Sequence, residues 1–276
     1  MSETRETTEP SGPSTPRTAA NGAPLRRTSK TVLYGLGFYA ATQLAGAFLA
    51  KNAVAADAVQ AALAEWGAGR IGIAWSDPTE PPPVWTALAT RAARGAAMGI
   101  AVAATVVVFA LATRAASLAP NTPLVGQLVV GLLASVLGAV RDELLLRGVV
   151  LHALDGWASS PWRVVACAGA AAAASWGTGH ANVVELAIAA ASGATLAAVW
   201  LHDRGAWMAV GANTAWTWAS GTLLRGGLLD VRARSGAWGG GDVGLQGSLA
   251  VALVLTVVAV AACAWTARDR RAPSAS

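Results

Sequence analysis

Seven long apolar runs without a charged side chain constrain the fold of this sequence more than any other feature. They occupy residues 31–50, 95–113, 115–140, 164–184, 186–201, 205–224 and 243–267. A helix that crosses a bilayer needs about 20 predominantly apolar residues, a length that all but the run at 186–201 match or approach closely. The pattern predicts an all-α fold, a polytopic transmembrane helical bundle with about 7–8 membrane helices.

The charged side chains make up only 13% of the chain and gather near its ends and in loops. Residues 1–30 and 267–276 together hold 12 of the 35 charges. Basic residues directly precede the first run and follow the last one, which predicts two cytoplasmic termini by the positive-inside rule. The net charge of +5 is therefore explained by topology. We expect a multi-pass protein of the cell membrane, in contact with the lipid bilayer and without a nucleic-acid partner.

Two ends on one side of a membrane require an even number of crossings, whereas the sequence shows seven runs. Either one run is re-entrant or a crossing lies hidden, for example within 124–160. The segment 52–66 is expected to lie at the interface. The predicted organisation is a disordered cytoplasmic tail at 1–30, N-terminal membrane helices with an interfacial helix and a loop at 31–123, a core bundle at 124–224, a loop and a last membrane helix at 225–266, and a basic C-terminal tail at 267–276.

Four charged side chains stand within a continuous apolar stretch, at Arg141, Asp142, Glu143 and Arg147. Ionisable side chains are costly in a bilayer and usually face a protein interior or a water-filled cavity. In a helix, Glu143 and Arg147 lie one turn apart on one face, in the order that favours an ion pair. A simple ion pair at the membrane surface and a functional site explain these four residues equally well.

Two later segments add a histidine, an amide and a hydroxyl. His180 follows a run of small residues, and Asn213 and Thr217 lie one helical turn apart. Each has an ordinary structural explanation as a hydrogen-bonding group at a helix end, between helices or within a turn. Together with the carboxylates they can support hydrolysis, in which a carboxylate activates water and His and Asn stabilise an oxyanion or hold a metal. Proton-coupled transport can use the same groups and is an alternative function at this point.

These segments resemble the CPBP family of intramembrane proteases, which includes CAAX prenyl endopeptidases and bacteriocin-processing or immunity proteins. The family pattern is Glu-Glu-x-x-x-Arg, then Phe-x-x-x-His, then His-x-x-x-Asn, on successive membrane helices. Residues 142–148 (Asp-Glu-Leu-Leu-Leu-Arg-Gly) resemble the first motif, and 176–180 (Trp-Gly-Thr-Gly-His) resemble the second. The stretch 193–218 is similar to the segment that carries the third, with Asn213 and Thr217 at its His and Asn positions.

The resemblance implies an intramembrane endopeptidase that hydrolyses a peptide bond near the membrane surface. Its implied catalytic residues are Asp142, Glu143, Arg147, His180, Asn213 and Thr217. In the family the first Glu of the pair is assigned as the water-activating base, and that position is Asp142 here. A peptide or a membrane protein is the expected substrate. The alternative is a catalytically degenerate relative that acts as a peptide-binding or bacteriocin-immunity membrane protein.

The resemblance also implies a candidate site for a divalent metal such as zinc. The ligands would be His180, Asp142 and Glu143, with Glu185 as a remote supplement. Asn binds divalent metals much more weakly than His, and zinc favours three or four protein ligands. The alternative is a metal-free mechanism in which Glu143 or Asp142 activates water while His180 and Asn213 polarise the carbonyl group.

Overall fold

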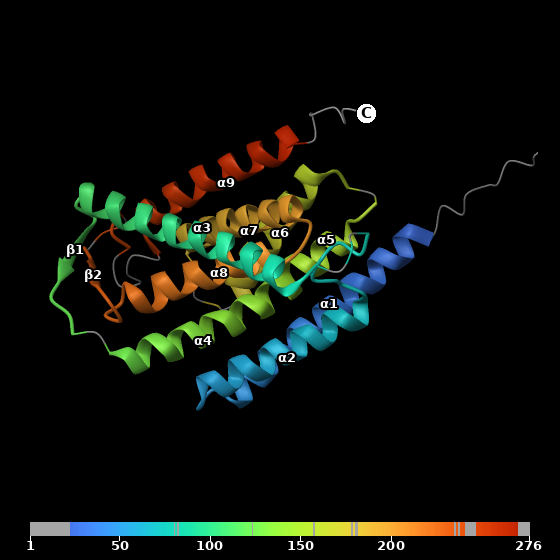
Figure 1. Ribbon diagram of the computed structural model, residues 1–276, viewed down its shortest axis with the longest axis horizontal. Helices are drawn as coiled ribbons and strands as arrows, with labels where there is room; N and C mark the ends of the chain where they lie inside the picture. Colours follow the sequence, from blue (N-terminus) through green and yellow to red (C-terminus); the bar gives the residue numbers. More distant parts are fainter. Residues whose placement is uncertain are drawn as a thin grey trace, which may run out of the picture.

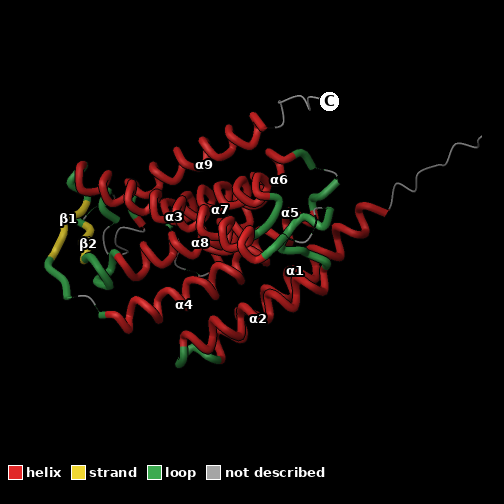
Figure 2. Tube along the Cα trace, viewed as in Figure 1, coloured by secondary structure: helices red, strands yellow, loops and turns green. Residues whose placement is uncertain are grey.

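Helices packed side by side make up almost all of the described structure, and a two-stranded sheet joins two loops at one end (Figure 1). The computed structural model describes residues 23–269 except for 80, 82, 123, 157, 178, 180–181, 235, 237 and 241–246. Figure 2 shows how little of this part lies in strands. The elements are α1 (Ala23–Phe48), α2 (Ala53–Ile71), α3 (Trp85–Ala112), β1 (Ala116–Ala119), α4 (Val125–Asp142), the π-helix η1 (Glu143–Gly148), α5 (Val149–Ala153), α6 (Ser160–Gly177), α7 (Val183–Asp203), α8 (Trp207–Trp218), the π-helix η2 (Ala219–Leu223), β2 (Asp230–Ala233) and α9 (Leu249–Asp269).

Successive helices run in opposite directions, so the bundle has two distinct ends (Figure 1). At one end the Thr28 hydroxyl, near the start of α1, donates to the Ala153 carbonyl at the end of α5 (2.9 Å). There too the Arg91 guanidinium, near the start of α3, donates to the Asp203 carbonyl at the end of α7 (3.2 Å). We call this the basic end after Arg70, Arg91, Arg163 and Arg204 at the helix termini there, of which Arg91 and Arg163 are paired with Asp203 and Asp155.

The opposite end, which we call the sheet end, is closed by β1 and β2. These strands pair antiparallel, with Ala116 opposite Ala233 and Ala119 opposite Asp230. The start of the predicted helical run at 115–140 is therefore a strand, and the loop expected at 225–245 contains the other strand. Pro120 explains the first difference, because a proline disfavours helical backbone in the residue before it.

The course of the helices determines whether the chain makes an odd or an even number of passes through the bundle. The rod formed by α4, η1 and α5 is continuous from Val125 to Ala153, so no reversal is hidden there. Instead, α2 runs back along α1, where Gly46 lies against Gln60 and Gly67 against Phe38. Among the described residues this makes eight helical passes, counting the rod as one and α8 with η2 as one. Both α1 and α9 consequently have their outer termini at the basic end.

Three of the described helices are long and apolar enough to cross a membrane by length and composition. They are the segments Trp85–Ala112, Val183–Asp203 and Leu249–Thr266. The chain is mostly helical, as predicted, and these three segments are typical of a membrane protein. The number of seven to eight crossings stays a prediction.

The predicted N-terminal tail is too long at its inner boundary. Helix α1 begins at Ala23, so residues 23–30 are helical. Pro24 is compatible with this start, because proline is tolerated in the first turn of a helix, where its missing N–H has no partner to lose. Residues 1–22 lie outside the described residues, as does most of the predicted C-terminal tail, because α9 is described as far as Asp269.

Helix α8 is held against α3 by glycines rather than by large side chains. A methyl group at Gly95 would overlap the carbonyl of Met208, and one at Gly99 would overlap the carbonyl of Ala212. On the other side of the contact, Gly211 lies equally close to the carbonyl of Ala92. Small residues at such contacts let membrane helices approach closely. This contact sets the position of the helix that carries Asn213 and Thr217.

Candidate active site

The first motif lies where the backbone leaves the regular α-helix. Glu143–Gly148 form the π-helix η1, which begins at the second carboxylate of the motif and ends at its glycine. Single π-helical turns inside α-helices are rare and are often found at functional sites. The wider turn still allows the predicted ion pair, with Arg147 Nη1 3.1 Å from Glu143 Oε1. The pair is enclosed by the protein, because the side chains of Glu143 and Arg147 are 0% and 5% exposed.

Helix α8 supplies the next partner of this carboxylate. Asn213 Nδ2 donates to Glu143 Oε1 at 2.9 Å, within the buried core. One turn later, the Thr217 hydroxyl donates to Asn213 Oδ1 at 3.3 Å. The hydroxyl thereby favours the amide orientation in which Nδ2 faces the carboxylate. Glu143, Arg147, Asn213 and Thr217 form one connected group, which we call the Glu143 cluster.

The second oxygen of this carboxylate differs from the first. Glu143 Oε2 is buried and has no hydrogen-bond partner among the described residues, and the same is true of Arg147 Nε and of Arg147 Nη1, which touches Oε1 only as an ion pair. Most buried polar atoms in proteins are hydrogen-bonded, so an unsatisfied one calls for an explanation such as a bound water or a catalytic role. Oε1 contacts Arg147 and accepts from Asn213, which leaves Oε2 as the acceptor of this carboxylate that has no partner among the described residues.

Asp142, the neighbouring carboxylate, belongs to a different group of side chains. Arg141 Nε donates to Asp142 Oδ1 at 2.7 Å, and the same guanidinium forms a short hydrogen bond with Gln60 of α2. We call Gln60, Arg141 and Asp142 the Asp142 cluster. Adjacent residues on a helix do not face each other, so the expected pair of carboxylates does not converge on one point. The structure brings Glu143, Arg147, Asn213 and Thr217 together but turns Asp142 toward α2.

The remaining predicted site residues have separate positions. His180 lies outside the described residues. Glu185 occupies the first turn of α7, where its carboxylate accepts from the backbone N–H of Asn182 (3.0 Å). The Asn182 side chain accepts in return from the backbone of Glu185, which completes a capping box. Glu185 thus stabilises a helix start at the sheet end, and its predicted role as a supplementary metal ligand has no support from this geometry.

The described residues do not fit a zinc site. No group of three His, Cys, Asp or Glu side chains in the described part of the chain has the geometry to hold a metal ion. Glu143 already lies against the positive charge of Arg147, which would repel a cation, and Asp142 is paired with Arg141. The metal set predicted from His180, Asp142 and Glu143 therefore lacks convergence of its two carboxylates. A role of His180 in metal binding stays a prediction.

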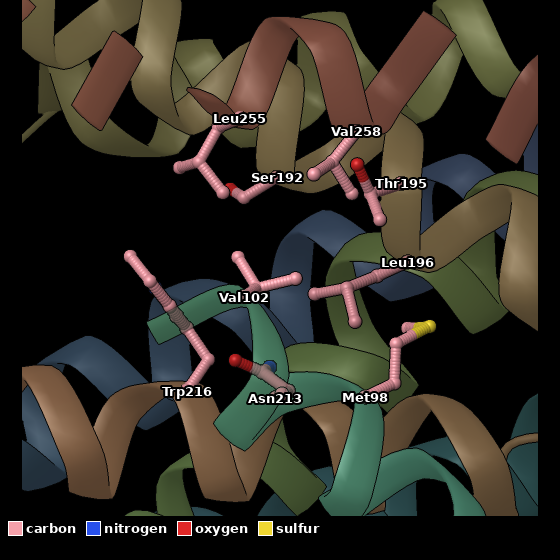
Figure 3. Close-up of a pocket in the computed structure, with 10 residues that line it drawn as sticks. Met98, Val102, Ser192, Thr195, Leu196, Asn213, Trp216, Leu255 and Val258 are labelled. Carbon is pink, nitrogen blue, oxygen red and sulfur yellow. The ribbon is translucent and has the colours of Figure 1, made fainter. Parts of the chain in front are cut away.

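An apolar cavity reaches the opposite side of Asn213 (Figure 3). Its volume is about 40 Å³, and α3, α7, α8 and α9 all contribute to its walls. The hydroxyls of Ser192 and Thr195 line it but donate to the backbone carbonyls of Ala189 and Ala191. The cavity can hold an aliphatic group, and its hydroxyls are not available to bind a charged ligand.

Sequence reasoning missed Gln60, because the segment 52–66 was expected to lie at the interface. Gln60 is 7% exposed and joins α2 to α4 through Arg141. The available signal was an amide among alanines and other apolar residues, because such a side chain, once buried, must find a hydrogen-bond partner.

Comparison with known proteins gives one match. Residues 124–219 match the family described as type II CAAX prenyl endopeptidase Rce1-like, over about a third of the chain. The region covers α4 to α8 and so contains the Glu143 cluster. No curated protein and no solved structure matches the chain.

Proposed function

Because residues 124–219 belong to the type II CAAX prenyl endopeptidase Rce1-like family, we propose that this membrane protein is an intramembrane endopeptidase that uses Glu143 to activate water. One observation carries the proposal. A fully buried carboxylate is held on one oxygen by an ion-pair contact with Arg147 and a hydrogen bond from Asn213, while its other oxygen has no hydrogen-bond partner in the described part of the structure. A general base needs such an oriented oxygen within hydrogen-bond reach of the water that it deprotonates.

In the proposed reaction, a water molecule bound at Glu143 Oε2 attacks the carbonyl carbon of the scissile peptide bond. One proton of the water passes to Oε2, the new C–O bond forms, and the carbonyl π electrons move onto its oxygen. Collapse of this tetrahedral intermediate re-forms the carbonyl and breaks the C–N bond. The proton held by Glu143 then passes to the leaving amine nitrogen, so the base is regenerated.

The neighbouring side chains have distinct proposed roles. Arg147 offsets the negative charge of the buried carboxylate, and Asn213 fixes its orientation, while Thr217 fixes Asn213. We assign Asn213 to holding Glu143 rather than to polarising the substrate, because its Nδ2 already donates to the carboxylate. His180 is the proposed group that polarises the carbonyl, by the resemblance of 176–180 to the second family motif.

The depth of the cluster fits cleavage close to one membrane surface. Glu143 lies ten residues before the end of α5, and Asn213 lies six residues after the start of α8. At 1.5 Å per residue these positions are roughly 15 and 9 Å from the basic end. We propose that the eight helical passes are eight crossings, α2 included, and that the basic end faces the cytoplasm of a cell membrane.

A second candidate function is a relative that binds a peptide or membrane partner without cutting it. The observation in its favour is that Glu143 is fully enclosed, with Asn213 and Thr217 at the positions where the family pattern has His and Asn. In that case the ion pair and the amide would serve only to fasten α8 to the rod.

A fluorogenic farnesylated CAAX peptide tests the two functions, with the purified chain in lipid nanodiscs. For a protease we expect cleavage that Glu143→Gln reduces by a factor of about 10²–10⁴, the usual contribution of a general base. His180→Ala should lose activity as well, and thermal unfolding should show that both variants are folded. If the chain binds the peptide without cleaving it, and the Glu143→Gln variant binds the peptide equally well, the protein is the non-cleaving relative.

A further inference from the structure

A polar cleft opens at the basic end, between the loop that follows α2 and the ends of α5 and α7. Its volume is about 640 Å³, and Gly148, the last residue of η1, lines it. A methyl group at Gly148 would lie 3.1 Å from the Ile73 side chain and 3.3 Å from the Trp200 ring. The loop and α7 therefore meet the rod at this glycine, and the cleft adjoins the segment that carries Glu143.

One side of the cleft is formed by residues 73–77, which we call the strap. Two backbone hydrogen bonds fix the strap to the turn between α7 and α8. The Asp77 N–H donates to the Arg204 carbonyl, and the Ala206 N–H donates to the Trp75 carbonyl, both at 2.9 Å. The strap is therefore a defined surface of the protein, although it lies in a loop.

Ser76 lies between these two hydrogen bonds and opposite Gly205, in an antiparallel bridge. In a bridge of this kind the central residue directs its own N–H and C=O away from the partner chain. Neither backbone group of Ser76 has a hydrogen-bond partner among the described residues, and Ser76 lines the cleft. The strap thus presents a backbone donor and acceptor to which an extended peptide can add as a further strand.

The side chains of the cleft favour a neutral polar chain over a lipid tail or a highly charged ligand. Charges of both signs line the cleft, and several of them are already satisfied. Arg163 forms a short ion pair with Asp155, and the Asp77 carboxylate accepts from the N–H and the hydroxyl of Thr79 at 2.8 and 2.6 Å. A hydrocarbon chain would desolvate these groups without replacing their bonds to water, whereas a peptide backbone can form hydrogen bonds with them.

The distance from the strap to the Glu143 cluster fits a single peptide. Gly148 lies five residues after Glu143, roughly 7 Å along the rod at about 1.5 Å per residue. From Ile73, which contacts Gly148, to Ser76 the strap adds at most roughly 10 Å. An extended chain advances about 3.3 Å per residue, so a peptide residue at Ser76 would be about three to five residues from a bond at Glu143.

We propose that the strap binds the peptide substrate as an added β-strand, an inference that rests on the proposed function. A peptide residue about three to five positions from the scissile bond would donate its N–H to the Ser76 carbonyl and accept from the Ser76 N–H. The substrate class is then a peptide that is extended at the basic end of the bundle. Because backbone groups make the contact, the strap selects for an extended conformation and against proline at the paired position.

A proline in the strap tests this pairing. Ser76→Pro deletes the outward N–H, whereas the bonds of the strap to the α7–α8 turn use other groups. Ala53→Pro, at the first position of α2 and at the sheet end, is the matched control, because proline is tolerated there. Both are placed in the Glu143→Gln chain in nanodiscs, and fluorescence anisotropy measures binding of the fluorogenic farnesylated CAAX peptide. We expect Ser76→Pro to weaken binding about two- to tenfold, the fold-change of one hydrogen bond, and Ala53→Pro to leave it unchanged.

N-methylation of the peptide locates the paired residue. At one position, three to five residues from the scissile bond, a methyl group should weaken binding to the Glu143→Gln chain about two- to tenfold. The same methyl group should have little further effect when Ser76→Pro is also present, since the pairing is already lost.

Photocrosslinking keeps the Ser76 backbone intact and so gives a result even if Ser76→Pro does not fold. p-Benzoylphenylalanine is introduced at Ala74, which is exposed in the strap, or at Leu118, which is exposed on β1 at the sheet end. We expect the peptide to be captured at Ala74 well above the level at Leu118.

Three outcomes would overturn the proposal. They are equal affinity of the Ser76→Pro and Ala53→Pro chains, full additivity of Ser76→Pro with every N-methyl group, and capture of phospholipid in place of peptide at Ala74, which would assign the cleft to lipid headgroups. Failure of the proposed function looks different. A peptide that pairs with the strap but stays intact on the unsubstituted chain would refute the protease and leave the strap as a binding site.

Discussion

Asp142 and Glu143 are adjacent carboxylates in one helical rod, yet they lie in opposite surroundings. Glu143 is fully buried and is held by Arg147 and by Asn213 of α8. The Asp142 side chain is 32% exposed and is paired with Arg141, which also reaches Gln60 of α2. The first cluster joins the rod to the helix that carries the third motif, and the second joins it to the α1–α2 hairpin. Adjacency in sequence therefore does not make these two carboxylates a pair.

A buried ion pair is strongly coupled to its partners, because removal of one partner leaves a charge in a medium that solvates it poorly. A partly exposed ion pair is worth much less, since water replaces the lost partner. Substitutions in the Glu143 cluster should consequently affect both stability and cleavage, whereas those in the Asp142 cluster should affect neither strongly.

The largest expected effect belongs to Arg147→Met, which leaves the Glu143 carboxylate buried without its cation. We expect a loss of about 3–5 kcal/mol in unfolding free energy, the usual cost of breaking a buried pair from one side. Denaturant unfolding of the purified chain in mixed micelles measures it. Arg147→Met with Glu143→Gln should recover a large part of that loss, and Arg141→Met, in the exposed pair, serves as the control. Equal losses in the two single Met variants would contradict the distinction between the clusters.

Gly99→Leu should disturb the Glu143 cluster from a distance. The new side chain would push α8 away from α3, because a group at Gly99 meets the Ala212 carbonyl and the Ala215 side chain. Overpacking of this kind costs about 1–3 kcal/mol, and we expect loss of peptide cleavage with it. Gly138→Leu is the matched control, since no atom lies within 4 Å of the added Cβ at Gly138. If cleavage by the Gly99 variant equals that of the control, the α3 contact does not position α8.

Thr217→Val removes the hydroxyl that orients the Asn213 amide. A single hydrogen bond contributes about 0.5–1.5 kcal/mol, so kcat for the fluorogenic peptide should fall by up to about tenfold. Thr217→Ser retains the donor and should retain activity. An unchanged kcat in the Val variant would show that Asn213 keeps its orientation without this bond.

Asp142→Asn should have the smallest effect, although the family pattern assigns the base to this position. The substitution preserves size and weakens a partly exposed ion pair that is worth at most about 1 kcal/mol. We expect kcat/KM for peptide cleavage to change by less than about tenfold, and Gln60→Leu should behave similarly. A loss as large as that of Glu143→Gln would assign the base to Asp142 and reverse the roles of the two clusters.

The sequence predicted the elements of the structure better than their mutual placement. The uncharged runs at 95–113, 164–184 and 205–224 each coincide with most of a helix, because their apolar length leaves few other conformations in a bilayer. The segment 52–66 was harder to place. Its Asp57 and Glu65 predicted a position at the interface, and in the structure the exposed Glu65 carboxylate accepts from the Trp75 indole (2.8 Å). Such a partner lies beyond the helix and cannot be derived from local hydropathy.

The candidate site was predictable in its spacing but not in its orientation. The four-residue separations of Glu143 from Arg147 and of Asn213 from Thr217 each place two side chains on one helix face, and both contacts are present. The same spacing does not determine which of the two adjacent carboxylates faces α8. Helix periodicity relates a residue to its own helix and says nothing about the side on which a neighbour packs.

The amino-acid sequence by itself determined that this chain is a mostly helical membrane protein, since apolar runs of this length must satisfy their backbone hydrogen bonds internally. It also determined the family motifs and their order. Only the tertiary structure decided that Glu143 is enclosed with Asn213 while Asp142 is paired with Arg141, which reaches Gln60. The physical reason is that burial and pairing depend on contacts between helices, here the close approach of α8 to α3 through Gly95 and Gly99 and of α2 to α4 through Arg141.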